Sequence, residues 1–576
     1  MSLSGSLQIG RSALTASQLA IQVAGNNLAN AATPGYSRQV AHLVPLRGPT
    51  DASGASTGRG VQVVEVRRAI DNALQARLND SVSREHAALA NQGALAQIES
   101  LLNELTGAGL SSELSQFFNA FSELANNPAG SETRAVVVEQ GVTLASFVRS
   151  LRSDLVNTQR QFDEQLSVSV RRADELLSQI AGLNRSIVES EQGRSTANEL
   201  RDRRDALVHE LSGLMEISTV EQNNGAIDVL VGSTPVVLGA NSRGVSFVRE
   251  NVNGELSVRI IVKSNEETLK VKSGSIGALM GQRTGTLRTT IDELDRIAGA
   301  VIHEVNTLHA SGAPGRPLRD TTGWLKVGAA DRSLSFNDPT NQTFAGLTHK
   351  PVNGAFSVRI TDEQGASTLH KIDVRLNGID DNGLVSFDDD TSLEDLRDAL
   401  HALPGLNAEI NASGQLRVFT DTGHNVSFGA DTSGVLAVLG INTYFTGTDA
   451  TDMGVRQQLL DEPLMLSAGF EPGSNEVALA IAGLRDKSLD SLGGFSISEG
   501  WLRNVERIAV EGDAANTRAA STKLVRESLD AQRAGVSGVS IDEESLNLMS
   551  FQRQYQGAAR FISVVDELLR TLISLV

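Results

Sequence analysis

The sequence contains no cysteine, and that absence removes several kinds of site. A chain without cysteine has no disulfide framework, no cysteine-ligated zinc and no thiol nucleophile. Long apolar runs are also missing: no stretch approaches about 18 uninterrupted apolar residues, the length of a membrane-spanning helix. Residues 1–18 lack a basic segment followed by an apolar core. We therefore expect no membrane insertion and no cleavable Sec-type signal.

Aromatic residues and positive charge are scarce as well. Aromatic residues make up 4% of the chain, so Leu, Val, Ile and Ala must fill the interior, which suits long packed helices. The 69 acidic residues outnumber the 50 basic ones, and the net charge of -19 repels a phosphate backbone. We therefore expect no nucleic-acid partner. The length of 576 residues predicts roughly four domains.

A heptad pattern occupies the first 31 residues. Alternating spacings of 4 and 3 connect Leu3, Leu7, Gly10, Leu14, Ser17, Ile21, Ala24, Leu28 and Ala31. This spacing predicts a helix with a coiled-coil seam, meaning the line of residues that faces a partner helix. Because every second seam residue is small, the seam buries little apolar area, and the helix should be marginal alone.

The C-terminal end carries a second seam, made of bulky residues: Leu548, Phe551, Tyr555, Ala558, Ile562, Val565, Leu569, Leu572 and Val576. Ser540 and Glu543 form a capping box, and residues 542–544 place acidic groups at the positive end of the dipole, so the helix begins near residue 541. An intramolecular helix pair would explain both seams. However, Phe561, Leu568 and Leu575 widen the apolar face beyond what two helices cover, so we expect contacts with further copies.

Residues 26–39, NNLANAATPGYSRQ, should end the first helix. Pro34 disfavours helix at Thr33, and residues 33–36 suit a type II turn in which Gly35 has positive φ. Such a turn alone would indicate only a solvated helix end. Three asparagines precede it, and they cost stability unless they are paired: Asn26, Asn27 and Asn30.

The stretch AGNNLANAATPGYSRQ resembles the N-terminal signature of the bacterial flagellar axial proteins, which comprise the rod proteins, the hook protein and the hook-associated proteins. The stretch SGVSIDEESLNLMSFQRQYQGAARFISVVDELLRTLI is similar to the C-terminal end of the same family. Ser37-Arg38-Gln39 and residues 541–544 favour the hook-associated members over rod or hook proteins. Residues 113–240 also resemble these members, and the resemblance is weakest over 330–450. Ala31 and Ala32 depart from the larger or polar residues that the family often has there.

The resemblance implies a structural component of the flagellum with no enzymatic activity and no cofactor. It implies export through the flagellar type III apparatus with an uncleaved signal, a secreted, extracellular location, and a place in the adaptor junction between hook and filament. The implied partners are other copies in a helical lattice, the hook protein, a second junction protein (hook-associated protein 3) and a flagellar export chaperone at the C-terminal helix. The expected assembly interface consists of Leu7, Leu14, Ile21, Leu28, Asn26, Asn27, Asn30, Thr33, Pro34, Gly35, Tyr36, Leu548, Phe551, Tyr555, Ile562, Val565, Leu569 and Leu572.

The middle of the chain changes character several times. Long helices are predicted at 70–105, 112–126 and 132–216, with breaks at 107–109 and 126–128. Strand composition with Asn-Gly turns begins near residue 217, and helix returns at 284–311. A further segment alternates in strand fashion around a helix capped by Thr391 and Glu394, and helices follow at 475–487 and 499–534.

The predicted fold is mainly α with inserted β-rich domains, in which long terminal helices form a coiled coil. The order of segments predicts nested domains: a terminal coiled-coil domain (1–35 with 541–576), a long-helix domain (36–216 with 475–540), a β-rich domain (217–330 with 451–474) and an inserted outer α/β domain (331–450).

Candidate catalytic and metal-binding residues are few. Ser56 lies in a G-x-S-x-G match, but the preceding strand that a nucleophile elbow needs is missing. His303 and His309 are six residues apart, so they point to nearly opposite faces of a helix and cannot share one zinc ion. An acidic cluster lacks EF-hand spacing and is better explained by turns and helix caps: Asp380, Asp381, Asp388, Asp389 and Asp390.

Two alternative functions remain open at this stage. A rod or hook protein of the same family would share residues 26–36 but not the Ser37-Arg38-Gln39 continuation or the long helices of 113–216. A secreted cell-wall hydrolase would need an acidic or metal site within 330–450.

Overall fold

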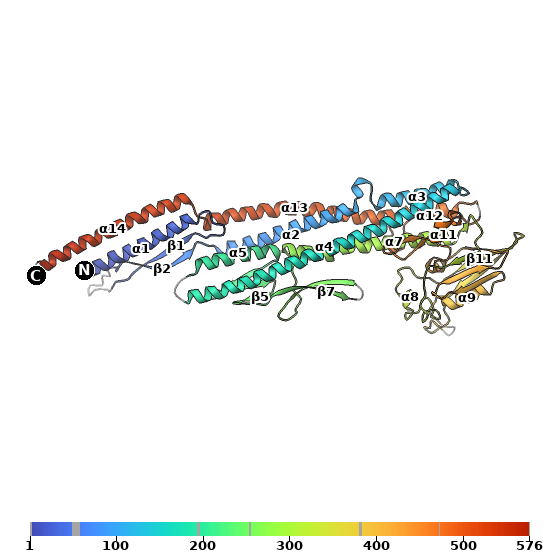
Figure 1. The fold of residues 1–576 in the computed structure, drawn as a ribbon, viewed down its shortest axis with the longest axis horizontal. Helices are drawn as coiled ribbons and strands as arrows, with labels where there is room; N and C mark the ends of the chain where they lie inside the picture. Colours follow the sequence, from blue (N-terminus) through green and yellow to red (C-terminus); the bar gives the residue numbers. More distant parts are fainter. Residues whose placement is uncertain are drawn as a thin grey trace. The chain divides into compact units, whose positions relative to one another are not determined.

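The structure is a computed structural model that describes residues 3–48, 58–192, 196–252, 255–379, 383–471 and 473–574. Long helices dominate it, and the strands form several small sheets (Figure 1). The chain divides into two compact units. Unit 1 contains Met1–Ala94, Gln161–Arg283 and Gly512–Val576, and unit 2 contains Leu95–Arg160 and Thr284–Glu511. Each unit is therefore assembled from segments that are far apart in the sequence.

The helices of unit 1 follow the predicted positions closely, with two exceptions: residues 274–284, predicted to belong to a β-rich stretch, form a helix, and one predicted helix is divided in two. They are α1 (Leu3–Ala29), α5 (Asn198–Leu214), α6 (Gly274–Thr284), α14 (Ile541–Ser574) and parts of α2 (Asn72–Leu102), α4 (Ser131–Glu191) and α13 (Ile497–Ser537). The predicted single helix over 132–216 is wrong, because α4 ends at Glu191. The Glu191 carboxylate accepts hydrogen bonds from the backbone N of Ala197 (2.9 Å) and Nε of Arg201 (2.7 Å), which fixes the turn into α5.

A buried apolar cluster holds two long helices of unit 1 together. Leu74, Leu78 and Val82 of α2 pack with Leu529 of α13. A buried ion pair adds to this unit: Nε of Arg283 lies 2.7 Å from Oδ1 of Asp163, and the two side chains are 4% and 1% exposed. The ion pair joins residues 120 apart and the apolar cluster joins segments still further apart, so unit 1 folds around contacts that the order of the sequence does not reveal.

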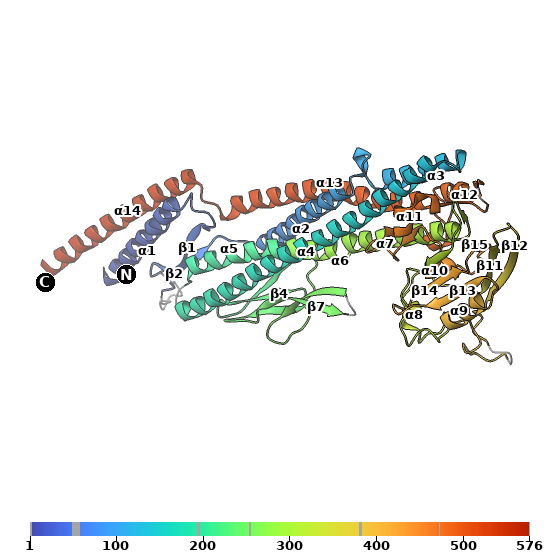
Figure 2. The same ribbon diagram turned by 45° about the vertical axis from the view of Figure 1, so that its right-hand side comes forward.

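The strands of unit 1 begin where the change in composition predicts, with one addition. β3 (Ser218–Glu221), β4 (Ile227–Val231), β5 (Thr234–Leu238) and β6 (Asn241–Ser242) form an antiparallel sheet, and β7 (Val245–Val252) pairs with β8 (Glu255–Val262). The sequence analysis missed the hairpin of β1 (Gln39–Pro45) and β2 (Val61–Arg68), which lies alongside α1 (Figure 2).

The helical part of unit 2 packs around a cluster of aromatic side chains. It contains α3 (Leu110–Asn126), α7 (Thr286–Ala310), α12 (Glu476–Gly483) and the short helices η1 (Glu104–Thr106), η2 (Pro463–Met465) and η3 (Asp490–Leu492). Phe117 and Phe121 of α3 each lie 5.7 Å, centroid to centroid, from the buried ring of Tyr444. The Tyr444 hydroxyl donates to the carbonyl of Val137 (2.7 Å). Residues near 444 therefore belong to this core.

The remainder of unit 2 is built of short strands and helices. Its sheets are β10 (Asp320–Thr322), β14 (Leu416–Thr420) and β13 (Leu406–Ile410); β12 (Ser367–Val374), β11 (Gly354–Thr361) and β15 (Asn425–Gly429); β9 (Ala313–Pro314) with β18 (Ser467–Gly469); and β16 (Phe445–Thr446) with β17 (Gly454–Val455). Its helices are α8 (Gln342–Ala345), α9 (Leu393–His401), α10 (Val435–Leu439) and α11 (Gln457–Asp461). The predicted cap of α9 is one residue early: Ser392 and Asp395 form the capping box, because the Thr391 hydroxyl instead accepts from the backbone N of Arg375.

His309 is a buried structural residue of unit 2. Its Nδ1 donates to the carbonyl of Asn442 (2.8 Å), and its Nε2 accepts from the backbone N of Ser467 (3.0 Å). Burial lowers the pKa of His309 from 6.5 to about 4. The folded protein therefore holds a neutral imidazole at pH values where the unfolded chain binds a proton.

We expect unit 2 to lose stability as the pH falls from 6.5 to 4. The stabilising effect of a depressed histidine pKa is complete above pH 6.5 and disappears as the pH falls toward the folded-state value; for His309 it is worth roughly 3 kcal/mol. Both tryptophans, Trp324 and Trp501, lie in unit 2, so urea unfolding followed by their fluorescence measures this unit. His309→Gln should reduce the pH dependence without removing it, because burial also lowers the pKa of His349 to about 4 in the same unit. His42→Gln at an exposed position of unit 1 should leave it unchanged. Equal pH dependence in wild type and His309→Gln would contradict this assignment.

Candidate assembly interface

The first and last helices, α1 and α14, pack against each other in antiparallel orientation (Figures 1 and 2). The intramolecular pair that the sequence analysis ranked below contacts between copies is thus present within the single chain. The pair is the natural place to look for the predicted interface residues, because all of them lie on α1, on the turn after it or on α14.

The buried face of α1 consists of small residues: Gly10, Ala16, Ser17, Ala20, Ala24 and Asn27. The predicted large positions behave differently, since Leu7, Leu14 and Ile21 are only partly buried and Leu28 is 37% exposed. The small half of the predicted seam, Gly10, Ser17 and Ala24, is therefore buried, whereas its large half is buried only in part. Small residues occupy it because α14 approaches closely on one side and the β1–β2 hairpin lies on another.

Gly10 shows how close the approach of the two helices is. A Cβ atom built on Gly10 would lie 2.7 Å from Cγ1 of Ile562 and 3.0 Å from Cδ1 of Phe561, distances shorter than carbon–carbon contact allows. Only glycine fits at this position without displacing the α14 side chains. Gly10 and Ile562 are therefore directly opposed in the pair.

The bulky seam of α14 faces α1 only in part. Ala558 and Val565 are buried, and Leu548, Phe551, Ile562 and Leu569 are partly buried. Two predicted seam residues remain exposed, Tyr555 (36%) and Leu572 (53%), and Val576 and Leu575 lie outside the described residues. A single partner helix therefore covers a fraction of the apolar surface of α14.

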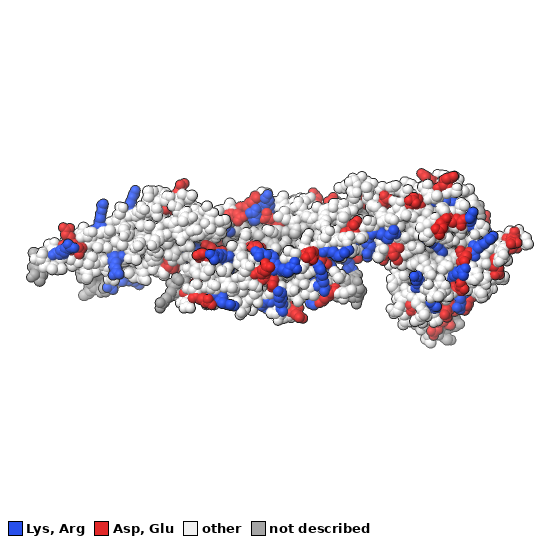
Figure 3. Space-filling model, in the orientation of Figure 1, with Lys and Arg blue, Asp and Glu red and all other residues white. Residues whose placement is uncertain are grey.

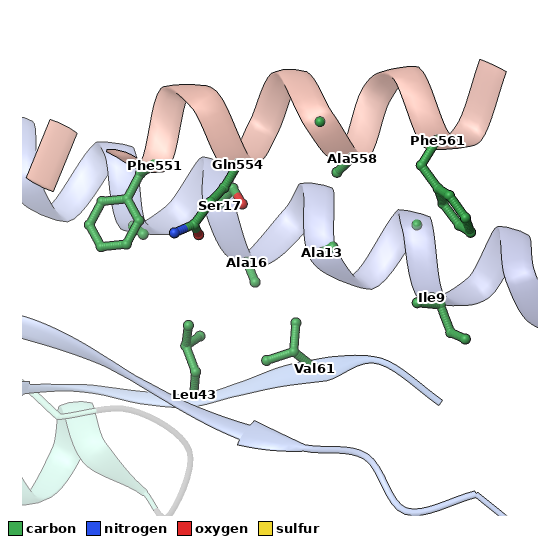
Figure 4. A pocket seen from close by; sticks show the side chains of 13 residues that line it. Ile9, Ala13, Ala16, Ser17, Leu43, Val61, Phe551, Gln554, Ala558 and Phe561 are labelled. Atoms are coloured by element: carbon green, nitrogen blue, oxygen red, sulfur yellow. The ribbon is translucent and has the colours of Figure 1, made fainter. Parts of the chain in front are cut away.

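An apolar groove of about 440 Å³ lies between α1, α14 and the β1–β2 hairpin (Figure 4). Ala13 and Ala16 line it from α1, Phe551 and Ala558 from α14, and Val61 from β2. The groove exists because the inner face of α1 is made of small side chains, which leave space that larger ones would fill.

Outside the line that faces α1, α14 carries exposed apolar side chains, here named the outer stripe: Leu546, Met549, Val564 and Leu568. These side chains are between 46% and 63% exposed. On the face seen in Figure 3, charged side chains are sparse over α1 and α14. Contiguous exposed apolar surface of this kind typically marks a site of protein association.

We expect both ends of the chain to be sensitive to proteases in dilute solution. The pair buries mainly small side chains, which contribute little apolar area. Trypsin should cut first at the exposed Arg11 and at Arg553, Arg560 and Arg570 of α14. The exposed Arg503 and Arg518 of α13 serve as matched sites, because α13 belongs to the two compact units. Trypsin should cut after these residues more slowly. Equal survival of both sets, measured by mass spectrometry, would show that the pair is as stable as the rest of the chain.

The turn after α1 has the predicted geometry. Gly35 has a φ of 79°, and the backbone N of Tyr36 donates to the carbonyl of Thr33 (3.2 Å), with Pro34 between them. Asn30 stabilises the helix end, because its Nδ2 donates to Oδ1 of Asn26 (2.6 Å) and its Oδ1 accepts from the Thr33 hydroxyl (3.2 Å). Asn26 and Asn30 thus act within the turn itself.

Asn27 lies at the centre of a buried polar cluster, and its amide uses all its hydrogen-bonding capacity. Nδ2 donates to the carbonyl of Gln39 (2.9 Å) and to Oε2 of Glu544 (3.2 Å). Oδ1 accepts from the backbone N of Gln39 (2.9 Å) and from the hydroxyl of Tyr36 (2.8 Å). The other carboxylate oxygen of Glu544 accepts from Nε of Arg38 (2.8 Å). Asn27 and Glu544 are 1% and 3% exposed.

The cluster also connects the terminal pair to the other helices of unit 1. The backbone N of Arg38 donates to the carbonyl of Ser537 at the end of α13 (2.9 Å), and that of Ser37 donates to Oδ2 of Asp202 in α5 (3.2 Å).

Burial, followed by the charges of Asp202 and Glu544, raises the pKa of Tyr36 to about 12. Tyr36 therefore remains a neutral hydrogen-bond donor. The sequence analysis singled out Asn27 and Tyr36 but missed Glu544 as their partner, although Glu544 stood out as an acidic residue in the first turn of α14.

The other candidate residues of the sequence analysis fall into structural positions. His303 stacks on His349 with ring centroids 4.3 Å apart, and His309 binds backbone groups. The side chains of His303 and His309 therefore do not meet. The buried Asp390 accepts from Nδ2 of Asn337 (2.6 Å) and from the backbone N of Gly378 (2.7 Å). Ser56, Asp380 and Asp381 lie outside the described residues. Within the described ranges, no group of three His, Cys, Asp or Glu side chains is placed to hold a metal ion.

Comparisons with known proteins point in one direction. The family model of the flagellar hook-associated protein FlgK helical domain matches residues 95–318, that of the flagellar basal body rod FlgEFG protein C-terminal region matches 532–575, and that of the flagella basal body rod protein matches 7–36. Flagellar hook-associated protein 1 of Bacillus subtilis (strain 168) is 26% identical over 579 residues, covering 99% of this chain and 97% of that protein. The protein of the same name from Escherichia coli (strain K12) is 23% identical and covers 98% of both.

A solved structure, the flagellar hook junction protein FlgK from Burkholderia pseudomallei, is similar with 15% sequence identity and a TM-score of 0.49, covering 80% of this chain and 100% of that one. The family and full-length matches confirm the resemblance to flagellar axial proteins, and they specify hook-associated protein 1 as the member that the chain resembles from end to end. None of the helices in the described ranges is both long enough and apolar enough to cross a membrane.

Proposed function

We infer that the chain is a structural protein of the bacterial flagellum that joins the hook to the filament. Flagellar hook-associated proteins 1 match it along nearly its whole length. The observation that carries this conclusion is the coverage of 97% and 98% of those proteins together with a match to the FlgK helical domain. The rod-type models match the two ends, at 7–36 and 532–575, so a rod or hook protein is the weaker interpretation.

The paired terminal helices supply the assembly interface in this proposal. Of the predicted interface residues, Phe551 lines the groove, and the outer stripe remains uncovered in a single chain. Neighbouring copies in a helical lattice would cover that stripe through heterologous contacts, in which different surfaces of the two copies meet. The buried apolar area that a single chain cannot provide would then come from assembly.

The specific partners in this proposal are those that the resemblance to flagellar axial proteins implies. Beside other copies, the hook protein would pack on one side of the junction and a second junction protein, hook-associated protein 3, on the other. Before assembly, a flagellar export chaperone would cover the outer stripe of α14, because exposed apolar side chains of this kind invite aggregation. The chain would be secreted through the flagellar export apparatus and reside at the hook–filament junction.

The division of the chain into four domains is also a proposal. The domains are 1–35 with 541–576, 36–216 with 475–540, 217–330 with 451–474, and 331–450. In this division, the terminal helices assemble and the inserted segments add bulk away from the lattice contacts. The buried Tyr444 and Phe445 pack with Phe117, so the outer segment should end before residue 444.

Deletion of the gene tests the proposed function. Cells that lack the chain should build hooks, fail to retain filaments and release flagellin into the medium, and expression of the wild-type chain should restore motility. Cells that lack the chain and still carry normal filaments would contradict the junction role. Cells without hooks would instead indicate a rod or hook protein.

A further inference from the structure

The paired surfaces of α1 and α14 repeat every seven residues, so apolar packing alone allows more than one register. Gly10, Ser17 and Ala24 present similar small surfaces at seven-residue intervals on α1. Tyr555, Ile562 and Leu569 repeat at the same interval on α14. A shift of one heptad would place Gly10 opposite Tyr555 or Leu569 in place of Ile562. Every such register pairs a large side chain with a small one.

The polar cluster at the other end of the pair does not repeat. Asn27 continues the buried line of α1, where a polar residue costs stability unless it is paired. Its four hydrogen bonds require Gln39, Tyr36 and Glu544 together, and Arg38 must reach the same carboxylate. A shift of one heptad would place Phe551 at the Asn27 position in one direction and would remove α14 from that position in the other, since α14 begins at Ile541.

We propose that Asn27 and Glu544 are a register lock, meaning a buried polar contact that selects one of several heptad-related pairings of α1 and α14. A single buried polar residue in an otherwise apolar helix pair is known to specify register at some expense of stability. Glu544 is the selective element because it brings a charge that must be paired when it is buried. Arg38, held by its backbone N on the end of α13, supplies that pairing at a fixed point. The proposal does not depend on the flagellar function.

The register matters because it decides which side chains α14 presents outward. In an antiparallel pair, a slip of one heptad moves the C-terminal part of α14 along α1 by about 10 Å, since a helix rises about 1.5 Å per residue. The outer stripe and the groove would then lie at different positions along α1 from those in the observed register. The lock thereby sets the position of the surface that other molecules meet.

Disulfide trapping in the full-length chain tests the proposal, because the sequence has no cysteine of its own. Gly10→Cys with Ile562→Cys reports the observed register, because the second substitution removes the Ile562 side chain that a Cβ atom at residue 10 would meet. Gly10→Cys with Tyr555→Cys, and Gly10→Cys with Leu569→Cys, report slips of one heptad in either direction; both carry Ile562→Ala, so that the cysteine at residue 10 does not itself disfavour the observed register. Mild oxidation followed by non-reducing electrophoresis measures the yield of each cross-link. With Glu544 intact, the 10–562 cross-link should dominate.

Glu544→Leu should allow the slipped registers, so the ratio of the 10–562 cross-link to the other two should fall by about tenfold or more. Glu544→Gln keeps the shape and an acceptor oxygen and should retain most of the selectivity. Glu567→Leu, at an exposed position of the same helix, is the matched control and should change nothing.

Two results would overturn the proposal. An unchanged ratio in Glu544→Leu would mean that the apolar seam alone selects the register. Loss of all three cross-links would mean that the cluster holds the pair together without choosing between registers.

Discussion

Replacing Ile562 and Leu569 with Asp should leave the thermal unfolding of the chain nearly unchanged and abolish the attachment of filaments. Both side chains are partly buried against α1, whose inner face is made of small residues, so their loss removes little of the stability of the two units. In a packed lattice the same positions would bury two carboxylates, which costs several kcal/mol without partners (roughly 2–7 kcal/mol for each polar group). Motility and filament retention measure the attachment of filaments, and calorimetry of the purified chain measures its thermal unfolding.

The control for this experiment is a pair of substitutions at exposed polar positions of α14, Gln552→Asp and Gln556→Asp, which should be tolerated better. Secretion must be measured in parallel, because α14 is also the proposed binding site of an export chaperone. Leu14→Asp with Ile21→Asp repeats the test on α1. A double variant that is secreted normally and still supports stable filaments would refute a role of the seam in assembly. A large drop in the melting temperature would instead assign the pair to the folding core.

Arg283→Met should destabilise unit 1 by roughly 3–5 kcal/mol. The substitution leaves the carboxylate of Asp163 buried, at 1% exposure, without its counter-charge. It also removes the hydrogen bond that Nη2 of Arg283 donates to the carbonyl of Leu256 (2.8 Å). Urea unfolding followed by circular dichroism measures the loss, because the tryptophans report unit 2.

Two further variants make the prediction specific to the buried pair. Arg172→Met removes an exposed arginine paired with Glu210 and Glu175, and its stability should equal that of the wild type within error. Arg283→Met combined with Asp163→Leu removes both charges and should recover much of the loss. If Arg283→Met were as stable as Arg172→Met, the buried pair would not hold unit 1 together.

The sequence predicted where most helices begin and end, because capping residues and glycines act locally. The breaks at 107–109 and 126–128, the start of α14 and the turn at Gly35 all depend on residues within one or two turns. The cap of α9 was misplaced by one residue, since Thr391 and Ser392 are both good cap residues and only the contact of Thr391 with Arg375 distinguishes them.

The faces of α1 were harder to predict than its extent. Almost every residue from Leu19 to Ala24 is apolar, so a seven-residue period fits adjacent lines. The predicted seam joined the line of Leu14, Ile21 and Leu28 to that of Gly10, Ser17 and Ala24. The structure buries the small residues because α14 and the β1–β2 hairpin approach from different sides. The partnership of Asn27 with Glu544 joins residues far apart in the chain, which no local pattern encodes. The hairpin, in contrast, pairs the nearby segments 39–45 and 61–68.

Immunogold labelling of this chain on intact cells, and on cells that lack filaments, tests the junction role most directly. We expect gold particles at the distal end of the hook in both kinds of cell, in a single narrow band. Label distributed along the hook, or confined to the rod, would contradict the proposal that the chain joins hook to filament.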